Sequence, residues 1–430
     1  MKVLFIDTDG VCTSMALQAQ YAGHQCRAFI SPQRCDNIAR GLVTRVADWR
    51  AHMDWADLIV MTGVGKYMRE LNGYFEKGYP IMGTNWHAAQ LEIDREIGME
   101  CFERAGFPCV PYQTFEDYDS AIAFVKKNKD KAYVSKPLHD NADKSTSYVA
   151  KDWRDMCFML ENWKKKGLKY PFILQEKIEL VGEVGVSGWF GPKGWCEGWE
   201  EDFEHKKLMP GEVGPNTGEM GNVCKYVEES KLARDYLEPL TDTLHALGFV
   251  GNFAMGLLVP KSGPLYPSEC TARLGWPITF QQQSLHKQPM VEFFKGVLDG
   301  EKRCAVSSKH ACGIVVGMKP FPYDALASDE MCDGYPIWGI TQENADHVHL
   351  AQVKAGRPLG EDGFVTAGSC VACCVGMGAS VTMARDKAMK LVKGLTIPNS
   401  PIYRDDIGEK LEKSLPVLKA KGYCEEWVYD

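Results

Sequence analysis

A basic triplet followed by a glycine-rich stretch is the part of the chain whose composition is best suited to binding an anion. The triplet His205-Lys206-Lys207 precedes residues 211–221, where every third or fourth residue is glycine. Glycine lets the main chain approach an anion closely, and Asn216, Thr217 and the triplet add hydrogen-bond donors. An ordinary surface turn would have a similar composition. Taken alone, the stretch therefore leaves an anion site and a surface turn equally open.

A second group of polar residues follows an expected strand. If the chain is extended there, Glu269, Thr271 and Arg273 lie on one face, because side chains alternate along a strand. A carboxylate, a hydroxyl and a guanidinium suit a Mg²⁺–phosphate site, since Mg²⁺ takes oxygen ligands and arginine binds anions through a fork of donors. A surface ion pair between Glu269 and Arg273 explains the same spacing, and spacing alone favours that simpler interpretation.

Two lysines form a third, weaker group. Lys136 ends an expected strand at 132–136, and Lys144 lies in the small-residue loop 143–147. Each could place a point charge beside triphosphate oxygens. Exposed lysines at strand ends are common, so this pair gains meaning only beside the other groups.

The first hundred residues predict the scaffold for an N-terminal ligand site. Apolar runs at 3–6, 25–30 and 58–61 indicate strands, and residues 14–22 indicate a helix ended by Gly23. Strands separated by helices favour a parallel sheet, which binds ligands where strands end, here at 7–13 and 62–66. The loop at 7–12 has one glycine and two acids, so it lacks the Gly-x-Gly-x-x-Gly fingerprint and argues against a nicotinamide oxidoreductase.

The rest of the chain is expected to contain both helices and strands. We expect a capped helix at 114–125, strands at 132–136 and 171–178, and a strand beginning at 182–190. Residues up to Gly221 are expected to form a long irregular loop, because glycine, tryptophan and acids dominate there. The later expectations are a helix at 234–247, a strand pair at 251–260 and 265–271, strands at 314–317 and 364–374, and a helix at 384–393.

The composition and the net charge argue against several classes of protein. The 430 residues carry 49 Lys plus Arg against 57 Asp plus Glu, a net charge of −8 without a basic block, which argues against nucleic acid. We find neither a signal-peptide core nor a stretch fit to span a membrane, so a cytoplasmic protein is expected. The 16 cysteines are then expected to be mainly reduced core residues, and Cys370-x-x-Cys373-Cys374 lacks a partner pair at zinc-finger spacing.

The order and spacing of these groups resemble the ATP-grasp family, and within it the glycinamide ribonucleotide synthetases (phosphoribosylamine–glycine ligases). Residues 214–221 match the family's Gly-Pro-Asn-Thr-Gly-Gly-Met-Gly motif except at Glu219. Residues 269–277 resemble its Glu-Phe-Asn-x-Arg-Phe-Gly-Asp-Pro segment. Residues 88–92 resemble a helix that precedes the ATP-grasp domain in the family, and residues 403–408 resemble its Tyr-Arg-x-Asp-Ile-Gly motif. The resemblance covers nearly the whole chain.

The resemblance implies an α/β and α+β multidomain fold. Its parts would be an N-terminal Rossmann-like parallel sheet (1–105), a central ATP-grasp domain (106–320, with a lid at about 115–180) and a small C-terminal mixed β domain (321–430). It implies ATP and Mg²⁺ (or Mn²⁺) as cofactors. Its substrates would be an amine and a small carboxylate such as an amino acid. The protein would join them through an acyl phosphate, in the manner of a purine-biosynthesis ligase. It would be a monomer or a homodimer.

The resemblance also assigns residues. ATP phosphates would be held by Arg95, Lys136 and Lys144, the base by Gln175, Glu176, Lys177 and Ile178, and the ribose by Glu183. The metal would be held by Glu269 and Thr271. Catalytic roles would belong to Arg273, Asn216 and Lys206, and substrate contacts to Gly214, Pro215, Thr217, Gly218, Asp9 and Gly10.

The chain also departs from the family pattern. Thr271 replaces a metal-binding Asn, residues 9–13 replace a phosphate-holding Gly-Gly-Arg-Glu-His, and residues 275–278 lose two acids. Asp7 and Asp9 would repel a sugar phosphate unless a cation or an amine neutralises them. We therefore expect a ligase with a changed acceptor, and as the alternative a non-catalytic ATP-binding relative that acts as a regulator or assembly partner.

Overall fold

The chain is described from a computed structural model, covering residues 1–8, 10–31, 37–138, 147–169, 171–323, 329–398 and 401–430. It forms two compact units. The first comprises Met1–Ala88, Val184–Ala254 and Thr271–Asp430, and the second Ala89–Glu183 and Met255–Cys270. Each unit contains a hydrophobic core of its own.

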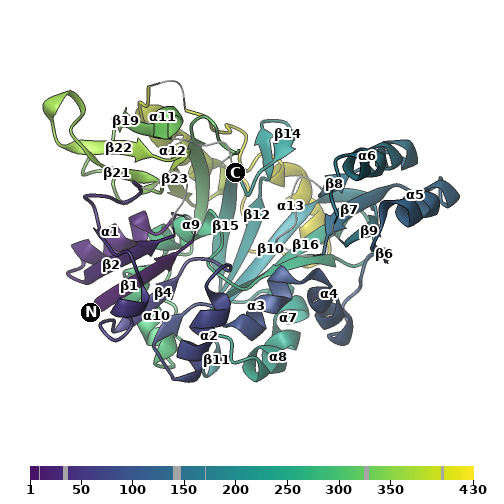
Figure 1. Ribbon diagram of the computed structural model, residues 1–430, viewed down its shortest axis with the longest axis horizontal. Helices are drawn as coiled ribbons and strands as arrows, with labels where there is room; N and C mark the ends of the chain where they lie inside the picture. Colours follow the sequence, from purple (N-terminus) through teal and green to yellow (C-terminus); the bar gives the residue numbers. More distant parts are fainter. Residues whose placement is uncertain (9, 32–36, 139–146, 170, 324–328, 399–400) are drawn as a thin grey trace. The chain divides into compact units, whose positions relative to one another are not determined.

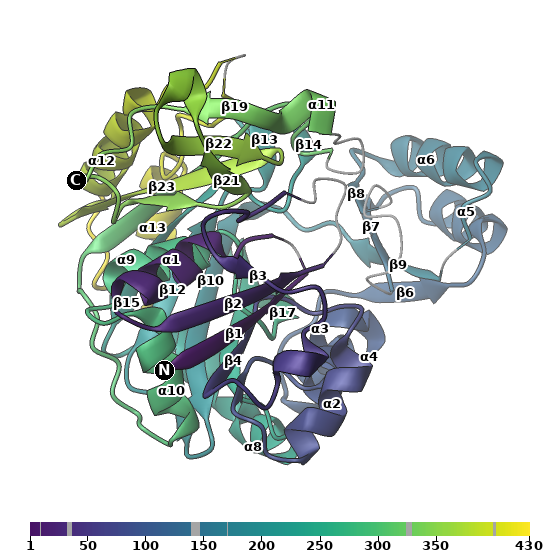
Figure 2. The same cartoon turned by 60° about the vertical axis from the view of Figure 1, so that its left-hand side comes forward.

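The first unit begins with a five-stranded parallel sheet in the order β3-β2-β1-β4-β5, whose central strands run side by side in Figure 2. The strands are β1 (Lys2–Asp7), β2 (Gln25–Ile30), β3 (Thr44–Arg45), β4 (Leu58–Met61) and β5 (Ile81–Met82). Residues 3–6 and 58–61 are buried, as continuous apolar runs in a parallel sheet should be. Helix α10 (Met290–Leu298), from far along the chain, packs on β4 and β5.

A second, antiparallel sheet carries strands in the order β10-β12-β15-β18-β23-β20. These are β10 (Leu180–Gly191), β12 (Trp199–Glu204), β15 (Gly221–Val227), β18 (His310–Gly317), β23 (Cys370–Gly378) and β20 (Val348–Leu350). Gly313 pairs with Val375, so Gly313 and Gly376 face opposite sides of this sheet. A Cβ on Gly313 would meet Gln281 of α9 (Ile278–Leu285), and one on Gly376 would meet Ala384 of α12 (Val381–Gly394), so the two helices cover opposite faces.

The first unit also contains smaller sheets and further helices. A small sheet has the order β19-β22-β21 (Asp333–Ile337, Gly363–Ala367 and Val353–Gly356), and β13 (Lys207–Met209) pairs with β14 (Val213–Asn216). The rest are α1 (Thr13–Tyr21), η1 (Arg50–His52), α2 (Met68–Glu76), β11 (Gly194–Trp195), α7 (Lys231–Tyr236), η3 (Glu238–Leu240), α8 (Thr241–Ala246), α11 (Asp329–Cys332), η5 (Pro358–Gly360) and α13 (Leu411–Ala420).

The second unit is built on a four-stranded antiparallel sheet in the order β6-β9-β7-β8. The strands are β6 (Tyr112–Phe115), β7 (Tyr133–Pro137), β8 (Tyr148–Val149) and β9 (Phe172–Glu176). Helices α5 (Tyr118–Lys127) and α6 (Trp153–Lys165) lie beside each other in Figure 1 and share a core with β7 and β9. The unit also holds α4 (Arg95–Arg104), most of α3 (Trp86–Ile93), and parts of the neighbouring strands β16 (Gly251–Pro260) and β17 (Tyr266–Thr271).

The expected helix at 114–125 is wrong at its start. Residues up to Phe115 belong to β6, and α5 begins only at Tyr118, after Asp117. The Asp117 side chain accepts a hydrogen bond from the Ser120 amide at 2.8 Å and caps the helix. A polar stretch with a threonine at its head had suggested an earlier cap, but pairing with β9 draws that threonine into the sheet.

Three further expectations need correction. The expected irregular loop before Gly221 contains the buried strand β12 and the hairpin β13–β14. The expected helix at 234–247 is divided into α7, η3 and α8, with Pro239 within the short 3₁₀ turn, since proline lacks the amide that a continuous helix needs. The expected strand at 364–374 is two strands, β22 and β23.

The fold class is confirmed for its main parts, the N-terminal parallel sheet and the antiparallel sheets that follow it. The predicted domain boundaries stay predictions. The described cysteines are free, and most are buried, as expected of reduced core residues. Among the described residues, we find no helix with the length and apolar character needed to cross a membrane.

Candidate functional site

The sheet of the second unit presents Lys136 and Gln175 on one face. In the β7–β9 register, Lys136 pairs with Ile173 and Val134 with Gln175, so these four side chains share a face. The opposite face carries Tyr133, Phe172 and Leu174, which pack into the core with α5 and α6. Lys136 is half-buried and Gln175 is buried. The sheet therefore holds both predicted nucleotide contacts on the side that faces away from its helices.

Arg95 lies next to the end of β7. It opens α4, whose N-cap Asp94 accepts hydrogen bonds from the Glu96 and Ile97 amides. The Arg95 amide donates to the Leu138 carbonyl at 2.9 Å, and its Nε donates to the Pro137 carbonyl at 3.1 Å. Since Pro137 directly follows Lys136, the structure brings these two predicted phosphate contacts together.

The expected base-binding segment joins β9 to β10. Glu176 forms an ion pair with Lys131, and the Lys177 amide donates to the Ala132 carbonyl at 2.8 Å. The Lys177 ammonium donates to the Ala150 carbonyl at 3.0 Å, so this side chain holds the sheet together. Ile178 follows, half-buried, and leads toward Glu183 near the start of β10. Gln175 and Glu176 end β9, and residues 177–179 form the short connection to β10, while the role of this segment in binding the base stays a prediction.

Two assigned residues, Asp9 and Lys144, lie outside the described residues. Gly10 is described, and its φ of +74° places it in the left-handed region that favours glycine. Its amide donates to Asp7 Oδ1 at 2.9 Å, which ties the loop after β1 to the end of that strand.

Strand β17 carries the predicted metal ligands. Glu269 and Thr271 are two residues apart, so they lie on the same face of the strand, and Glu269 is exposed. The strand ends at Thr271, so the alternation does not extend to Arg273 as the sequence suggested. Arg273 donates from Nη1 to the carbonyl of Leu274 at 3.1 Å. A carboxylate and a hydroxyl form an oxygen donor set of the kind that Mg²⁺ takes.

The glycine-rich stretch forms a hairpin. Lys207 pairs with Asn216 and Met209 with Val213, so the basic triplet and the glycine motif are brought onto adjacent strands. The Lys206 carbonyl accepts from both the amide and the hydroxyl of Thr217, at 2.7 and 2.8 Å. The Lys206 ammonium contacts Glu204 at 2.8 Å. Gly214, Pro215, Asn216 and Gly218 are exposed at this hairpin.

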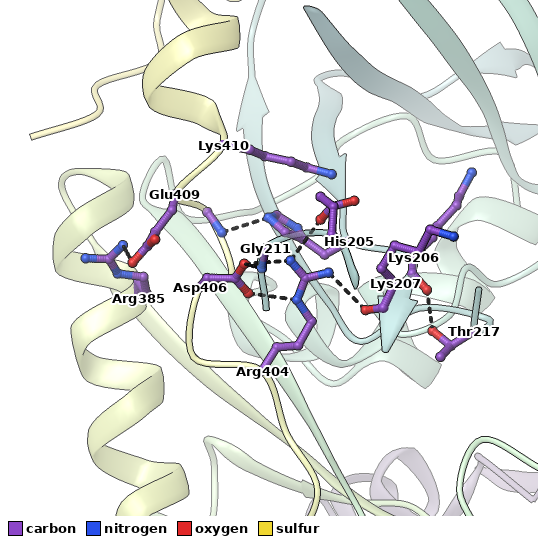
Figure 3. Close-up of polar contacts among 12 residues, drawn as sticks. His205, Lys206, Lys207, Gly211, Thr217, Arg385, Arg404, Asp406, Glu409 and Lys410 are labelled. Carbon is purple, nitrogen blue, oxygen red and sulfur yellow. Dashed lines mark hydrogen bonds and ion pairs between the residues drawn. The ribbon is translucent and has the colours of Figure 1, made fainter. Parts of the chain in front are cut away.

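Arg404, which is 1% exposed, makes hydrogen bonds that fix the hairpin in place (Figure 3). Its guanidinium forms two hydrogen bonds to Asp406, at 2.7 and 2.8 Å, one to Glu212 at 2.8 Å and one to the Lys207 carbonyl at 2.9 Å. Asp406 also accepts from the Gly211 amide at 2.9 Å. Residues at each end of the hairpin are thus fastened by one arginine–aspartate pair from the C-terminal region.

His205 makes a second connection to that region. Its Nε2 accepts from the Gly408 amide at 2.9 Å, and the Lys410 ammonium donates to the Glu204 carbonyl. Burial, followed by the charges of Lys410 and Arg404, holds the pKa of His205 well below its usual range, so the ring is neutral and can accept. Sequence reasoning gave Arg404 and Asp406 no role, although it had noted the Tyr403–Gly408 match.

A buried acidic cluster, which was not predicted, lies beside the hairpin. On β12, Glu200 and Asp202 share a face, and the side-chain Nδ2 of Asn222 donates to Asp202 at 2.9 Å and to Glu219 at 3.0 Å. Burial and then the nearby Glu204 raise the pKa of Asp202 and of Glu219 well above their usual range. The departure at Glu219 was the one signal that could have pointed here.

Comparison with known proteins gives a consistent result over nearly the whole chain. No known family profile matches the sequence. Phosphoribosylamine--glycine ligase of Neisseria meningitidis is 24% identical over 454 residues, covering 95% of this chain and 99% of that protein. The same ligase of Clostridium acetobutylicum is 25% identical, with 95% and 100% covered.

Solved structures agree on the fold. Phosphoribosylamine--glycine ligase of Thermotoga maritima superposes with a TM-score of 0.72 at 19% identity, covering 95% of this chain and all of the other. The chain therefore resembles the ATP-grasp ligases in sequence and in fold. The biotin carboxylase domain of the Hydrogenobacter thermophilus 2-oxoglutarate carboxylase, solved with MgADP and bicarbonate, has the same fold at a TM-score of 0.62 and 14% identity, covering 93% of this chain and 91% of that one. The chain is thus a distant homologue of phosphoribosylamine–glycine ligases.

Proposed function

We propose that this protein is an ATP-dependent carboxylate–amine ligase that forms an amide-type bond through an acyl phosphate, with an acceptor that differs from phosphoribosylamine. The observation that carries the proposal is the similarity to phosphoribosylamine–glycine ligases along 95% of the chain. The residues predicted to contact ATP, the metal and the substrates, from Arg95 to Arg273, occur in the same order along the chain as the matching motifs of the family.

The proposed reaction needs charge neutralisation and positioning more than a nucleophilic side chain. A substrate carboxylate oxygen attacks the γ-phosphorus of ATP, so ADP leaves and an acyl phosphate forms. The amine then attacks the acyl carbon, inorganic phosphate leaves, and the amine proton goes to solvent. Arg95 and Lys136 would neutralise ATP phosphates, and Asn216 and Arg273 would bind the acyl group. Mg²⁺ held by Glu269 and Thr271 would neutralise phosphate charge, for which their oxygen donors are suited.

The test is ADP release in the presence of Mg-ATP across a panel of amino acids and amines, with glycine and phosphoribosylamine as the reference pair. At least one pair should raise ADP release well above the rate with ATP alone. Lys136→Ala and Glu269→Ala should each abolish that increase. Lys164→Ala, which removes an exposed lysine of α6 in the same unit, is the control and should retain it. Wild-type rates in Lys136→Ala or Glu269→Ala would refute the assignment.

A second candidate function follows from two departures from the family pattern. Thr271 offers the metal a neutral hydroxyl, a weaker ligand than the Asn found in the family, and residues 275–278 lack two of the family's acids. A non-catalytic ATP-binding relative would bind Mg-ATP saturably and release no ADP with any pair in the panel. Isothermal titration calorimetry with Mg-ATP beside the ADP assay separates this candidate from the ligase.

A further inference from the structure

The end of strand β1 lies where a parallel sheet of this kind receives a ligand. Strands β1 and β4 are parallel neighbours, and at their carboxyl ends stand Asp7 and Thr62. Helix α1 begins at Thr13, directly after the loop that follows β1. A crevice at such strand ends, next to a helix N-terminus with free amides, is the usual place for an anion such as a phosphate.

In this protein, the carboxylate of Asp7 already occupies those donors. Asp7 Oδ1 accepts from the Gly10 amide at 2.9 Å and from the Thr62 hydroxyl at 2.8 Å, and Oδ2 accepts from the Val11 and Cys12 amides, both at 2.7 Å. Asp7 is fully buried. A carboxylate has about four lone-pair sites, so these hydrogen bonds use them all.

The loop is shaped around that carboxylate. Gly10 takes a positive φ of +74°, and a Cβ there would come within 2.7 Å of Ile38, so the tight turn that aims the amides inward needs glycine. Amide-to-carboxylate hydrogen bonds are charge-assisted and strong, and here they satisfy buried groups that would otherwise be unpaired. A phosphate at the same amides would have to displace Asp7 and would meet its negative charge.

We propose that Asp7 is a specificity-determining residue, because it fills this anion position with a group of the chain itself. It follows that the amine acceptor carries no phosphate at this strand end. This conclusion about the acceptor rests on the ligase function proposed above, whereas the occupation of the anion position does not.

The first test measures binding of inorganic phosphate through the melting temperature, at constant ionic strength kept with chloride. Asp7→Ala frees the three amides and removes the charge, so phosphate should raise its melting temperature more than that of the wild type. Thr62→Val is the matched control, since it removes one donor and leaves both the carboxylate and the amides. Its phosphate response should equal that of the wild type. Equal responses in all three proteins would overturn the proposal.

The second test uses the wild-type protein, so it stands even if Asp7→Ala does not fold. Pairs of amines that differ only by a phosphate group are compared for kcat/KM in ADP release. The unphosphorylated amine should be preferred, or the two should be used equally. A tenfold preference for the phosphorylated amine would overturn the proposal. If no amine supports ADP release, the ligase function fails, while the phosphate response still decides the role of Asp7.

Discussion

At the scale of single residues, the hairpin of the candidate site depends on buried charges whose surroundings set their chemistry. Arg404 is enclosed by two carboxylates and a carbonyl, whereas Arg385 in the same region makes an ion pair with Glu409 that is open to water (Figure 3). Buried ion pairs broken on one side leave a costly unpaired charge, while exposed pairs contribute little.

The first prediction contrasts these two arginines. Arg404→Met should lower the free energy of unfolding by about 3–5 kcal/mol, because Asp406 is left partly buried without its partner. Arg385→Met, the control, should cost less than about 1 kcal/mol. Urea denaturation followed by circular dichroism measures both. Equal, small losses in the two variants would show that Arg404 is not the anchor of the hairpin.

The second prediction concerns Glu200. Burial raises its pKa from an ordinary value of 4.5 to about 7, while Gln282 donates to its carboxylate at 2.7 Å. A folded-state pKa above the unfolded one stabilises the fold below pH 4.5, and that stability is lost as the pH rises through 7. At 1.36 kcal/mol per unit, the loss is about 3 kcal/mol.

Glu200→Gln keeps the shape of this side chain and removes its titration. Its stability relative to the wild type should therefore rise between pH 5 and pH 8, as measured by thermal and urea unfolding at both values. Glu197→Gln, at an exposed position, is the control and should show no such change. A constant difference across that range would mean that Glu200 does not titrate near pH 7 in the folded state.

At the scale of elements, close contact between a helix and a sheet supports the first unit. Helix α12 lies on β23 where Gly376 leaves room: a Cβ there would come within 2.2 Å of the Ala384 carbonyl oxygen and 2.3 Å of the Ala388 amide nitrogen. These are backbone atoms, so a side chain at this position would push the helix away from the strand.

The third prediction follows from that contact. Gly376→Ala should destabilise the protein by about 3 kcal/mol, since an overpacked core costs energy even for one methyl group. Gly394→Ala, at the end of the same helix, meets no atom within 4 Å and should be neutral or slightly stabilising. Chemical denaturation of both variants provides the comparison. A well-tolerated Gly376→Ala would contradict the close approach of α12 to the sheet.

At the scale of the whole molecule, the chain has two compact units with separate cores. The core of the second unit includes Leu160 and Trp163 of α6, and the core of the first includes Phe293 and Phe294 of α10. Units with their own cores are expected to unfold as separate cooperative blocks.

The fourth prediction is therefore two unfolding transitions in differential scanning calorimetry. Leu160→Ala should lower the midpoint temperature of one transition, and Phe294→Ala that of the other. Each core truncation should reduce the free energy of unfolding of its unit by about 2–5 kcal/mol. Adding Mg-ATP at a hundredfold excess over its dissociation constant should stabilise the protein by about 2.7 kcal/mol. A single transition lowered by both substitutions would mean that the two units unfold together.

Local patterns in the sequence were enough to predict many elements and the order of the candidate contacts. The strands at 58–61 and 251–260 have the predicted bounds, because continuous or alternating apolar residues between polar ends express burial directly. The early start assigned to α5 was wrong, because pairing of 112–115 with β9 outweighed a local capping signal. The roles predicted for Lys136, Glu269 and Arg273 stay predictions.

Only the tertiary structure decided which polar groups are buried and what they contact. Residues 200–202 form an acidic run that suggests a solvated surface, yet they lie in the strand β12 beneath α9. Arg404 contacts the hairpin although almost two hundred residues of sequence separate them. Asp7 accepts hydrogen bonds from main-chain amides that, from the sequence, could have bound a ligand. The sequence by itself determined the resemblance to the ATP-grasp ligases and the order of the motifs, since those depend on residue types and spacing. The partner of each charge was decided by folding, because burial and hydrogen bonding depend on residues that are distant along the chain.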